Sequence, residues 1–241
     1  MVDKRIIAFY LPQYHPFPEN DEWWGKGFTE WRNVVKARPL YRGHYQPHLP
    51  ADLGFYDLRV PEVRQQQADM ARMYGINGFC YYHYWFNGKR LMDRPVKEIL
   101  ASGQPDFPFM LCWANENWSR NWDGKFRNIL IEQHYSEEDD IEHMRYLCSK
   151  VFQDTRYIRI DGKPVFAIYR SNFFPNMKHT IDVWRKVAKE EYGIELYLIR
   201  VENEPDFGPK YLDCGFDSAM DFQPLLMGEF NAWWKNLPVS Y

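Results

Sequence analysis

Short, nearly continuous apolar runs alternate with stretches of helical spacing along the chain. Apolar runs bounded by turn signals are typical of buried strands. Apolar residues that recur every three or four positions form one face of a helix. The pattern predicts helices at about 60–74 and 95–100, after Ser136 and before Gly193, and strands at 5–11, 76–84, 107–113, 164–169, 194–201 and 216–220.

Turn and cap signals support several of these boundaries. Pro61 suits the first turn of a helix, and Gly75 suits a helix end. Ser136 followed by Asp139 resembles a capping box. Asp161-Gly162 predicts a hairpin between 157–160 and 164–169. We expect the apolar face of the first helix to comprise Val60, Val63, Met70, Ala71 and Tyr74.

Strands that alternate with helices predict an α/β fold with a parallel sheet. Neither a GxGxxG nor a GxxxxGK[ST] pattern occurs, which favours a β/α barrel over a nucleotide-binding fold. A (β/α)8 TIM barrel takes about 250 residues with short loops. Here a long first βα loop occupies about 12–58, and we count six main strands. The sequence therefore predicts one domain over 1–241, a (β/α)8-type barrel that is truncated or incomplete at its C-terminus.

Composition and charge exclude several classes of protein. The net charge is −3 and no basic stripe is present, which argues against a nucleic-acid partner. The longest apolar run lies within 6–11, far short of the roughly 20 residues of a transmembrane segment. No signal-peptide pattern is visible, and the four cysteines form no CxxC motif. We expect a cytoplasmic protein with reduced, buried thiols.

Aromatic residues make up 18% of the chain, and at each predicted strand end they stand beside polar side chains. Such mixtures suit sugars, whose C–H faces stack on rings and whose hydroxyls need donors and acceptors. The alternative is that the rings fill the core and cover the barrel rim. The candidate substrate contacts are Tyr10, Gln13, His15, Trp24, Glu30, Trp31, His83, Trp85, Trp113, Asn115, Asn117, Trp118, Arg170, Glu202 and Asp221.

Glu116 is the candidate catalytic residue, because it stands between two asparagines and two tryptophans at the third strand end. Tryptophan walls would raise its pKa, as a general acid requires. The alternatives are direct sugar contact, or a structural carboxylate bonded to backbone N–H groups or to Arg120. Glycoside cleavage usually needs a second carboxylate. Its candidates are Glu30, which we expect on a loop surface, and Glu202, Glu204 and Asp221.

Metal and cofactor chemistry is not expected. His44 and His48 are four residues apart, but Pro47 lies between them, so a regular helix does not present them together. With His15 and His83 we interpret them as structural or sugar-binding histidines. The sequence contains no G-x-S-x-G, and no cysteine stands in a typical nucleophile context.

Six motifs taken together resemble the WbsX-type glycosyltransferase-like family. They span most of the chain in a specific order: YLPQYHP at 10–16, WGKGFTEW at 24–31, YQPH at 45–48, GFCYYHYWF at 78–86, WANENW at 113–118 and DGKPV at 161–165. The resemblance implies a relation to glycoside hydrolase family 99, the endo-α-mannosidases and endo-mannanases, which are (β/α)8 barrels. It also implies a place in bacterial surface-polysaccharide biosynthesis, in particular of lipopolysaccharide O-antigen.

The chain departs from this pattern in one respect. Those relatives use two glutamates three residues apart in an Asn-Glu-Trp-x-x-Glu-like motif late in the barrel, and no such motif occurs before Tyr241. We therefore predict a carbohydrate-active domain that cleaves or transfers glycosidic linkages, an enzyme at least in the parent protein. The alternatives are a non-catalytic glycan-binding module and a protein-interaction scaffold. The expected partners are an oligosaccharide or polysaccharide, with self-association or association with other polysaccharide-biosynthesis proteins through the open sheet edges.

Overall fold

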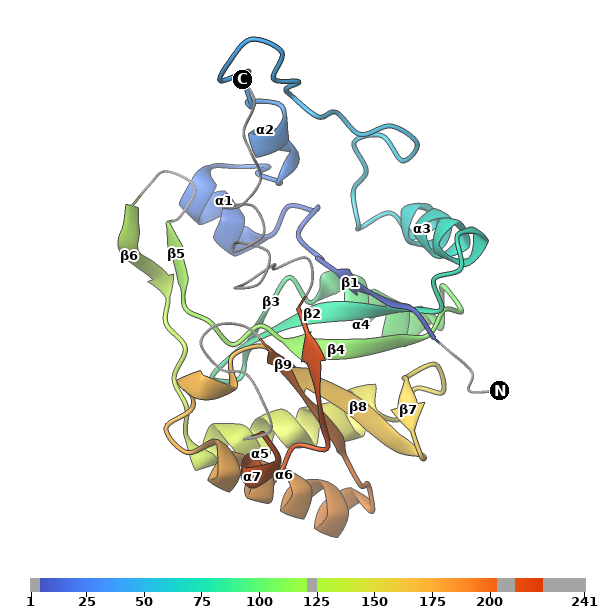
Figure 1. The fold of residues 1–241 in the computed structure, drawn as a ribbon, viewed down its shortest axis with the longest axis vertical. Coiled ribbons are helices and arrows are strands. Elements are labelled where there is room, and N and C mark those ends of the chain that lie inside the picture. The colour runs from blue at the N-terminus through green and yellow to red at the C-terminus, as the bar shows by residue number, and fades with distance from the viewer. Residues whose placement is uncertain (1–4, 121–124, 203–210, 223–241) are drawn as a thin grey trace, which may run out of the picture.

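The computed structural model describes residues 5–120, 125–202 and 211–222, and its centre is one curled parallel sheet (Figure 1). Its strands follow the chain in the order β1 (Ile7–Tyr10), β2 (Gly78–Phe86), β4 (Phe109–Trp113), β8 (Lys163–Ile168), β9 (Tyr197–Glu202) and β10 (Ser218–Asp221). Every neighbouring pair on this path is parallel. The predicted six strands are confirmed as an incomplete barrel, open between β1 and β10 in the described residues.

Helices follow the strands as a β/α barrel requires. They are α3 (Pro61–Met73), α4 (Arg94–Ser102), α5 (Glu137–Tyr146) with a π-helical turn over Leu147–Val151, α6 (Met177–Tyr192) and α7 (Tyr211–Cys214). The Ser136 side chain accepts a hydrogen bond from the Asp139 backbone N–H, so the predicted cap is confirmed. Gly193 ends α6 with a left-handed φ of 66°. In the described residues, no helix is both long and apolar enough to cross a bilayer.

The apolar face predicted for α3 is wrong in part. Tyr74 is exposed, whereas Arg64 and Gln67 are buried with two alanines. Arg64 is buried because its guanidinium donates to the Leu58 carbonyl and pairs with Glu98 at 2.8 Å. Gln67 accepts a hydrogen bond from the Tyr10 hydroxyl. The polar partners on neighbouring elements thus allow α3 to bury a face that differs from the one predicted by its apolar residues.

Several short helices and strands lie at the ends of the sheet. The first loop carries α1 (Pro18–Trp24) and α2 (Trp31–Val34). Strand β3 (Lys89–Leu91) pairs with the end of β2, and β5 (Trp118–Arg120) forms a hairpin with β6 (Lys125–Ile131). The predicted hairpin at Asp161-Gly162 is confirmed, and it joins β7 (Arg159–Ile160) to β8. The sequence analysis missed β3 and the β5–β6 hairpin, whose segments lack a clear apolar alternation.

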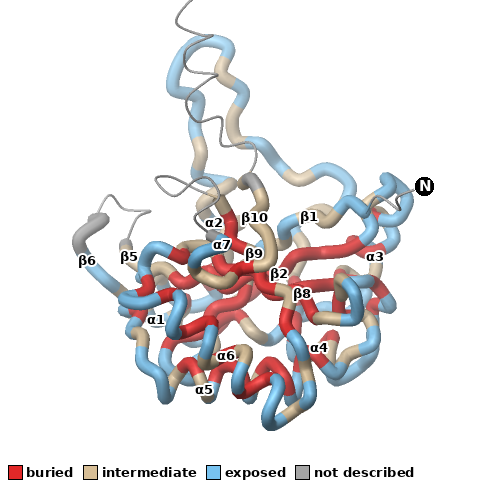
Figure 2. The backbone as a smooth tube through the Cα atoms, turned by 60° about the horizontal axis from the view of Figure 1, so that its bottom comes forward, coloured by how far each residue is buried: buried red, intermediate tan, exposed pale blue. Residues whose placement is uncertain are grey.

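The two faces of the sheet differ in what covers them. Figure 2 shows the buried backbone concentrated where the sheet meets α5 and α6. The concave face is less covered, and there an apolar groove of about 350 Å³ is lined by Ile7, Phe9, Met110, Ile199 and Met220 among others. The first strand was predicted to be buried, which is wrong. Among the described strands it lies at the sheet edge and pairs with β2 alone, and Phe9 is 36% exposed.

All four cysteines are free, as expected, but burial is uneven. Cys80, Cys112 and Cys148 are buried, and Cys214 is half-buried. The described residues contain no group of three or more His, Cys, Asp or Glu side chains placed to hold a metal ion.

Candidate functional site

A pocket of about 280 Å³ lies where four parallel strands end. Chemistry in β/α barrels is built at this carboxyl-terminal face. Residues of α1 and of the β5–β6 hairpin also line it. Its lining residues come from the ends of β1, β2, β4 and β8 and from these flanking elements: Gln13, Asn20, Trp24, Tyr82, Tyr84, Ala114, Glu116, Asn117, Trp118, Ser119, Leu130 and Tyr169.

Aromatic rings brace one another around this pocket. Trp118 packs edge-on against Tyr84 at 5.3 Å and against Trp23 at 5.6 Å between ring centroids. Tyr82 packs edge-on against Tyr169 at 6.0 Å. Such contacts fix ring orientation, so the pocket offers rigid apolar faces next to hydroxyl, amide and carboxyl groups. This combination matches the two kinds of surface on a sugar.

Glu116 lines the pocket as one half of an ion pair. Its Oε1 accepts a hydrogen bond from Arg170 Nε at 2.8 Å, and the carboxylate is 40% exposed. The Arg170 guanidinium in turn lies 4.9 Å from the centre of the Tyr169 ring. The ion pair therefore holds the Glu116 carboxylate at the wall of the pocket, and its role in general-acid chemistry stays a prediction.

Asn115 positions Glu116 rather than facing the pocket. Its amide is fully buried: Nδ2 donates to the Arg170 carbonyl at 2.8 Å and to the Tyr135 hydroxyl at 3.0 Å. Its Oδ1 accepts from the Arg170 backbone N–H at 2.8 Å. These bonds join the chain after β4 to the chain after β8, which carry Glu116 and Arg170. We therefore no longer expect Asn115 to contact a substrate.

Glu30 is the second carboxyl group of interest, and it is less exposed than expected. Its Oε1 is buried and has no hydrogen-bond partner, although Glu30 stands at the N-cap of α2. Burial raises the pKa of this carboxyl group to about 7. Burial raises the pKa of Tyr84, and the charges of Glu116 and Glu30 raise it further. Both carboxyl groups thus raise the pKa of a tyrosine that lines the pocket.

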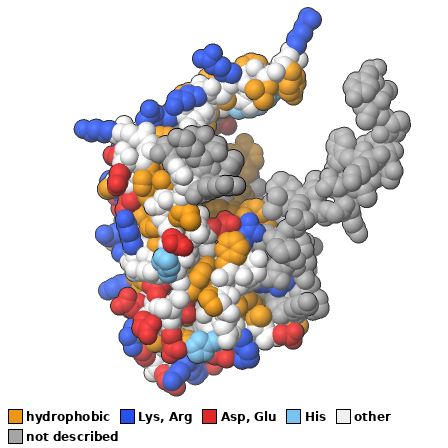
Figure 3. All heavy atoms as spheres, turned by 90° about the vertical axis from the view of Figure 1, so that its left-hand side faces the viewer, with side chains coloured by type: hydrophobic (Ala, Val, Ile, Leu, Met, Phe, Trp, Pro, Cys, Tyr) orange, Lys and Arg blue, Asp and Glu red, His pale blue; other side chains and the backbone are white. Residues whose placement is uncertain are grey.

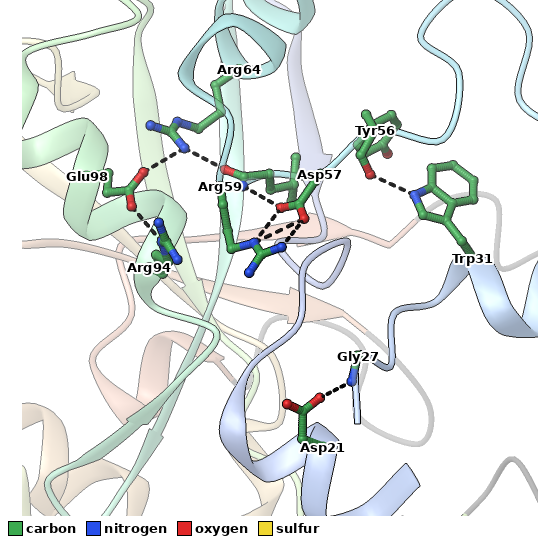
Figure 4. A network of polar contacts seen from close by, with 10 residues as sticks. Asp21, Gly27, Trp31, Tyr56, Asp57, Arg59, Arg64, Arg94 and Glu98 are labelled. Atoms are coloured by element: carbon green, nitrogen blue, oxygen red, sulfur yellow. Dashed lines mark hydrogen bonds and ion pairs between the residues drawn. The ribbon is translucent and has the colours of Figure 1, made fainter. Parts of the chain in front are cut away.

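The first loop is tied to the barrel on the α3 side, as Figure 4 shows. Arg64 on α3 donates to the Leu58 carbonyl, and Trp31 Nε1 donates to the Tyr56 carbonyl at 2.8 Å. The Trp31 ring also lies 4.4 Å from that of Tyr14. Trp31 therefore holds α2, and with it Glu30, against the end of the first loop, and its contact with a substrate stays a prediction.

Four other predicted contacts lie on the helix-facing side of the sheet. His83 Nε2 is 2.9 Å from His143 Nε2 on α5, and Trp85 Nε1 donates to Asp139 at 2.9 Å. Trp113 is almost fully buried and donates to the Trp85 carbonyl at 3.2 Å. Tyr10 bonds Gln67 on α3. The reason is strand alternation, because neighbours along a strand point to opposite faces.

Some of the remaining predicted residues line the pocket and others do not. Gln13, Trp24, Asn117 and Trp118 line the pocket. His15 is buried beside Phe17, and burial lowers its pKa to about 4. Glu202 pairs with Arg200 at 2.9 Å. Asp221 ends β10, but its side chain lies outside the described part of the chain, as does Glu204.

The sequence analysis missed residues that complete the pocket. Tyr82, Tyr84 and Tyr169 line it, together with Asn20 and Ser119. A signal was present in β2, where Tyr82 and Tyr84 follow Cys80 at two-residue spacing and therefore share its inward face. To tell which side chains of β2 face inward, one must know where the helices lie. In the structure, α5 packs on His83 and Trp85, so Tyr82 and Tyr84 face the pocket. Asn20 belongs to α1, a helix that the polar segment 18–24 did not predict.

Comparisons with known proteins agree with this architecture. The family model described as "Glycosyltransferase WbsX" matches residues 6–238. WxcX proteins from two strains of Xanthomonas campestris pv. campestris are 44% identical over 219 residues, which is 91% of this chain and 31% of theirs. The chain thus spans about a third of the length of these curated relatives.

Solved structures show the same fold at low sequence identity. The GH99 endo-alpha-mannosidase from Bacteroides thetaiotaomicron superimposes with a TM-score of 0.56 and 15% identity, covering 91% of this chain and 61% of that one. Its complex with bis-tris propane superimposes with a TM-score of 0.58 and 14% identity, covering 92% of this chain and 60% of that one. A glycoside hydrolase-like protein superimposes with a TM-score of 0.57 and 15% identity, covering 92% of this chain and 59% of that one. By its motifs, its family match and its fold, the chain belongs to the WbsX glycosyltransferase family.

Proposed function

We propose that the chain is the glycan-binding part of a carbohydrate-active enzyme, with the substrate held in the pocket at the strand ends. The observation that carries this proposal is the lining: braced aromatic rings beside Gln13, Asn117 and the Glu116–Arg170 pair. The family description names a glycosyltransferase, and two of the similar structures are endo-alpha-mannosidases by title. The family description supports transfer of a glycosidic linkage, and the two titles support its cleavage in a mannose-type glycan.

The biological setting belongs to the same proposal. We place the activity in bacterial surface-polysaccharide biosynthesis, including that of lipopolysaccharide O-antigen, and in the cytoplasm. Free thiols at all four cysteines suit a reducing compartment. Self-association, or association with other polysaccharide-biosynthesis proteins, stays a prediction that follows from the open edges at β1 and β10.

The chemistry we propose divides the work between two carboxyl groups. Glu116, held by Arg170, acts as the nucleophile or base, and Glu30, whose pKa burial raises to about 7, supplies a proton. Two carboxyl groups with different roles are the usual arrangement in glycoside chemistry. Neither residue corresponds to the late glutamate pair of the GH99 relatives.

Glycan turnover by the chain is expected to fall as the pH rises through about 7, because Glu30 then loses the proton that it donates. Glu30→Gln and Glu116→Gln are each expected to lower turnover about 100-fold, the usual contribution of acid–base groups. Glu62→Gln, on the exposed start of α3, is the control and should leave turnover unchanged. A pH profile with no alkaline limb near 7, or full activity in Glu30→Gln, would refute this assignment of roles.

The alternative is a non-catalytic glycan-binding module. It is favoured by the chain's span of about a third of its curated relatives, which leaves room for the catalytic pair elsewhere in a longer protein. Saturable oligosaccharide binding without turnover under any condition would select this alternative.

Binding itself is tested by calorimetric titration of the chain with mannose-containing oligosaccharides. Saturable binding is expected, and Trp118→Ala should weaken it about tenfold, because a braced ring in contact with a ligand contributes roughly that much. Tyr74→Ala removes an exposed ring outside the pocket and should leave the affinity unchanged. Equal affinity for Trp118→Ala and the parent chain would mean that the glycan binds elsewhere or not at all.

A further inference from the structure

A projecting arm, residues 35–51, carries exposed apolar side chains that the pocket does not use. The arm leaves the body after α2 and returns to α3 (Figure 1). Leu40 is 84% exposed, and Tyr41, Tyr45 and Leu49 are each more than half exposed. Single exposed apolar residues are ordinary, but a group of them on a protruding segment marks a contact surface.

The charge of this segment is opposite in sign to that of the whole chain. Between Glu30 and Asp52 the sequence has four basic residues and no acidic one, whereas the net charge of the chain is −3. Three of the basic residues, Lys36, Arg38 and Arg42, are exposed on the arm. Figure 3 shows Lys and Arg side chains next to hydrophobic ones where the arm stands clear of the body.

The tip of the arm is a defined turn. The His44 backbone N–H donates to the Tyr41 carbonyl at 3.1 Å, and the Leu40 N–H donates to His44 Nδ1 at 3.2 Å. The Tyr41 and His44 rings stack at 4.6 Å, with Gly43 between them at a φ of +86°. The hydrogen bond from its backbone N–H holds Leu40 next to this turn, where its side chain is 84% exposed. Its exposure is therefore held by local structure, which lowers the entropy cost of docking.

The mixture of residues identifies the partner. Aliphatic side chains, tyrosines and cations without carboxylates match the interface of a bilayer that contains anionic lipid. An acidic glycan or peptide would satisfy the cations but would leave Leu40 and Leu49 in water. We propose that the tip of this arm docks on an anionic membrane surface, with Leu40 and Tyr41 entering the interface and Arg38 and Arg42 contacting lipid phosphates.

Co-sedimentation with lipid vesicles tests this directly. The 241-residue chain is expected to bind vesicles of phosphatidylcholine with phosphatidylglycerol, to bind pure phosphatidylcholine far less, and to be released by high salt. Arg38→Glu with Arg42→Glu should weaken binding about 25-fold or more, at about fivefold for each cation lost. Leu40→Ser with Tyr41→Ser keeps the charge and should weaken binding about tenfold.

The matched control is Lys150→Glu with Lys186→Glu, which reverses two exposed lysines on the helical layer and should bind as the parent does. Circular dichroism spectra confirm that each variant is folded. Three results would overturn the proposal: no binding to anionic vesicles, unchanged binding in Leu40→Ser/Tyr41→Ser, or equal loss in the control. Binding to soluble polyglutamate as tight as to vesicles would also overturn it, because charge alone would then explain the interaction. None of these outcomes depends on whether the pocket binds a glycan.

Discussion

Replacing Asn115 with alanine is expected to lower the free energy of unfolding by about 3 kcal/mol, since buried polar groups that lose a partner cost about 1–3 kcal/mol each. The change deprives the Arg170 N–H, the Arg170 carbonyl and the Tyr135 hydroxyl of hydrogen bonds. The same bonds hold the chain after β4 against the chain after β8. Glycan affinity should therefore fall together with stability, although Asn115 does not line the pocket.

Urea denaturation at neutral pH measures this effect. Asn172→Ala is the matched control, since Asn172 is exposed in the same βα loop as Arg170, and a surface change of this kind is expected to stay within about 0.5 kcal/mol. A loss of less than about 1 kcal/mol in Asn115→Ala would show that the buried amide does not join these two segments.

Acid should destabilise the fold through the buried pair His83–His143. The two Nε2 atoms are 2.9 Å apart, so one ring donates to the other and the accepting ring is neutral. Burial lowers the pKa of His83 to about 3 and lowers that of His143. Between about pH 6.5 and these values the unfolded chain binds more protons than the folded chain, so stability falls as the pH falls.

Other groups titrate in the same range and must be separated from this pair. Burial raises the pKa of Glu30 to about 7 and that of Asp140 to about 6, so these carboxyl groups favour the folded state as the pH falls. The double variant His83→Gln/His143→Gln removes the imidazoles but keeps neutral hydrogen-bonding groups. Between pH 6.5 and 5.0 the parent should lose about 3 kcal/mol more unfolding free energy than the variant. Parallel pH profiles for the two proteins would refute the role of the histidine pair.

Local signals in the sequence were enough to predict the fold. The Asp161-Gly162 hairpin, the Ser136 cap and the alternation of strands and helices depend on neighbours along the chain, and each is confirmed. The six-stranded, incomplete barrel follows from their order. Which side of each helix or strand is buried was harder to predict, because burial depends on partners from other segments. Arg64 is buried through Glu98 and Leu58, which no periodicity reveals.

The same limit applied to the site. The sequence located the strand ends correctly, and Glu116, Asn117 and Trp118 line the pocket. It did not distinguish His83 and Trp85, which face α5, from Tyr82 and Tyr84, which face the pocket. It also placed Glu30 on a loop surface and did not identify Arg170 as the partner of Glu116. The structure buries an oxygen of Glu30 and pairs Glu116 with Arg170, because burial and pairing depend on tertiary contacts.

The most direct test of the account is a crystal structure of the chain with a mannose-containing oligosaccharide. We expect one sugar ring in the pocket, in contact with Trp118 and within hydrogen-bond distance of Gln13, Asn117 or the Glu116–Arg170 pair. An oligosaccharide bound only on the arm or in the apolar groove lined by Phe9 and Met110, with the strand-end pocket empty at saturation, would contradict the central claim.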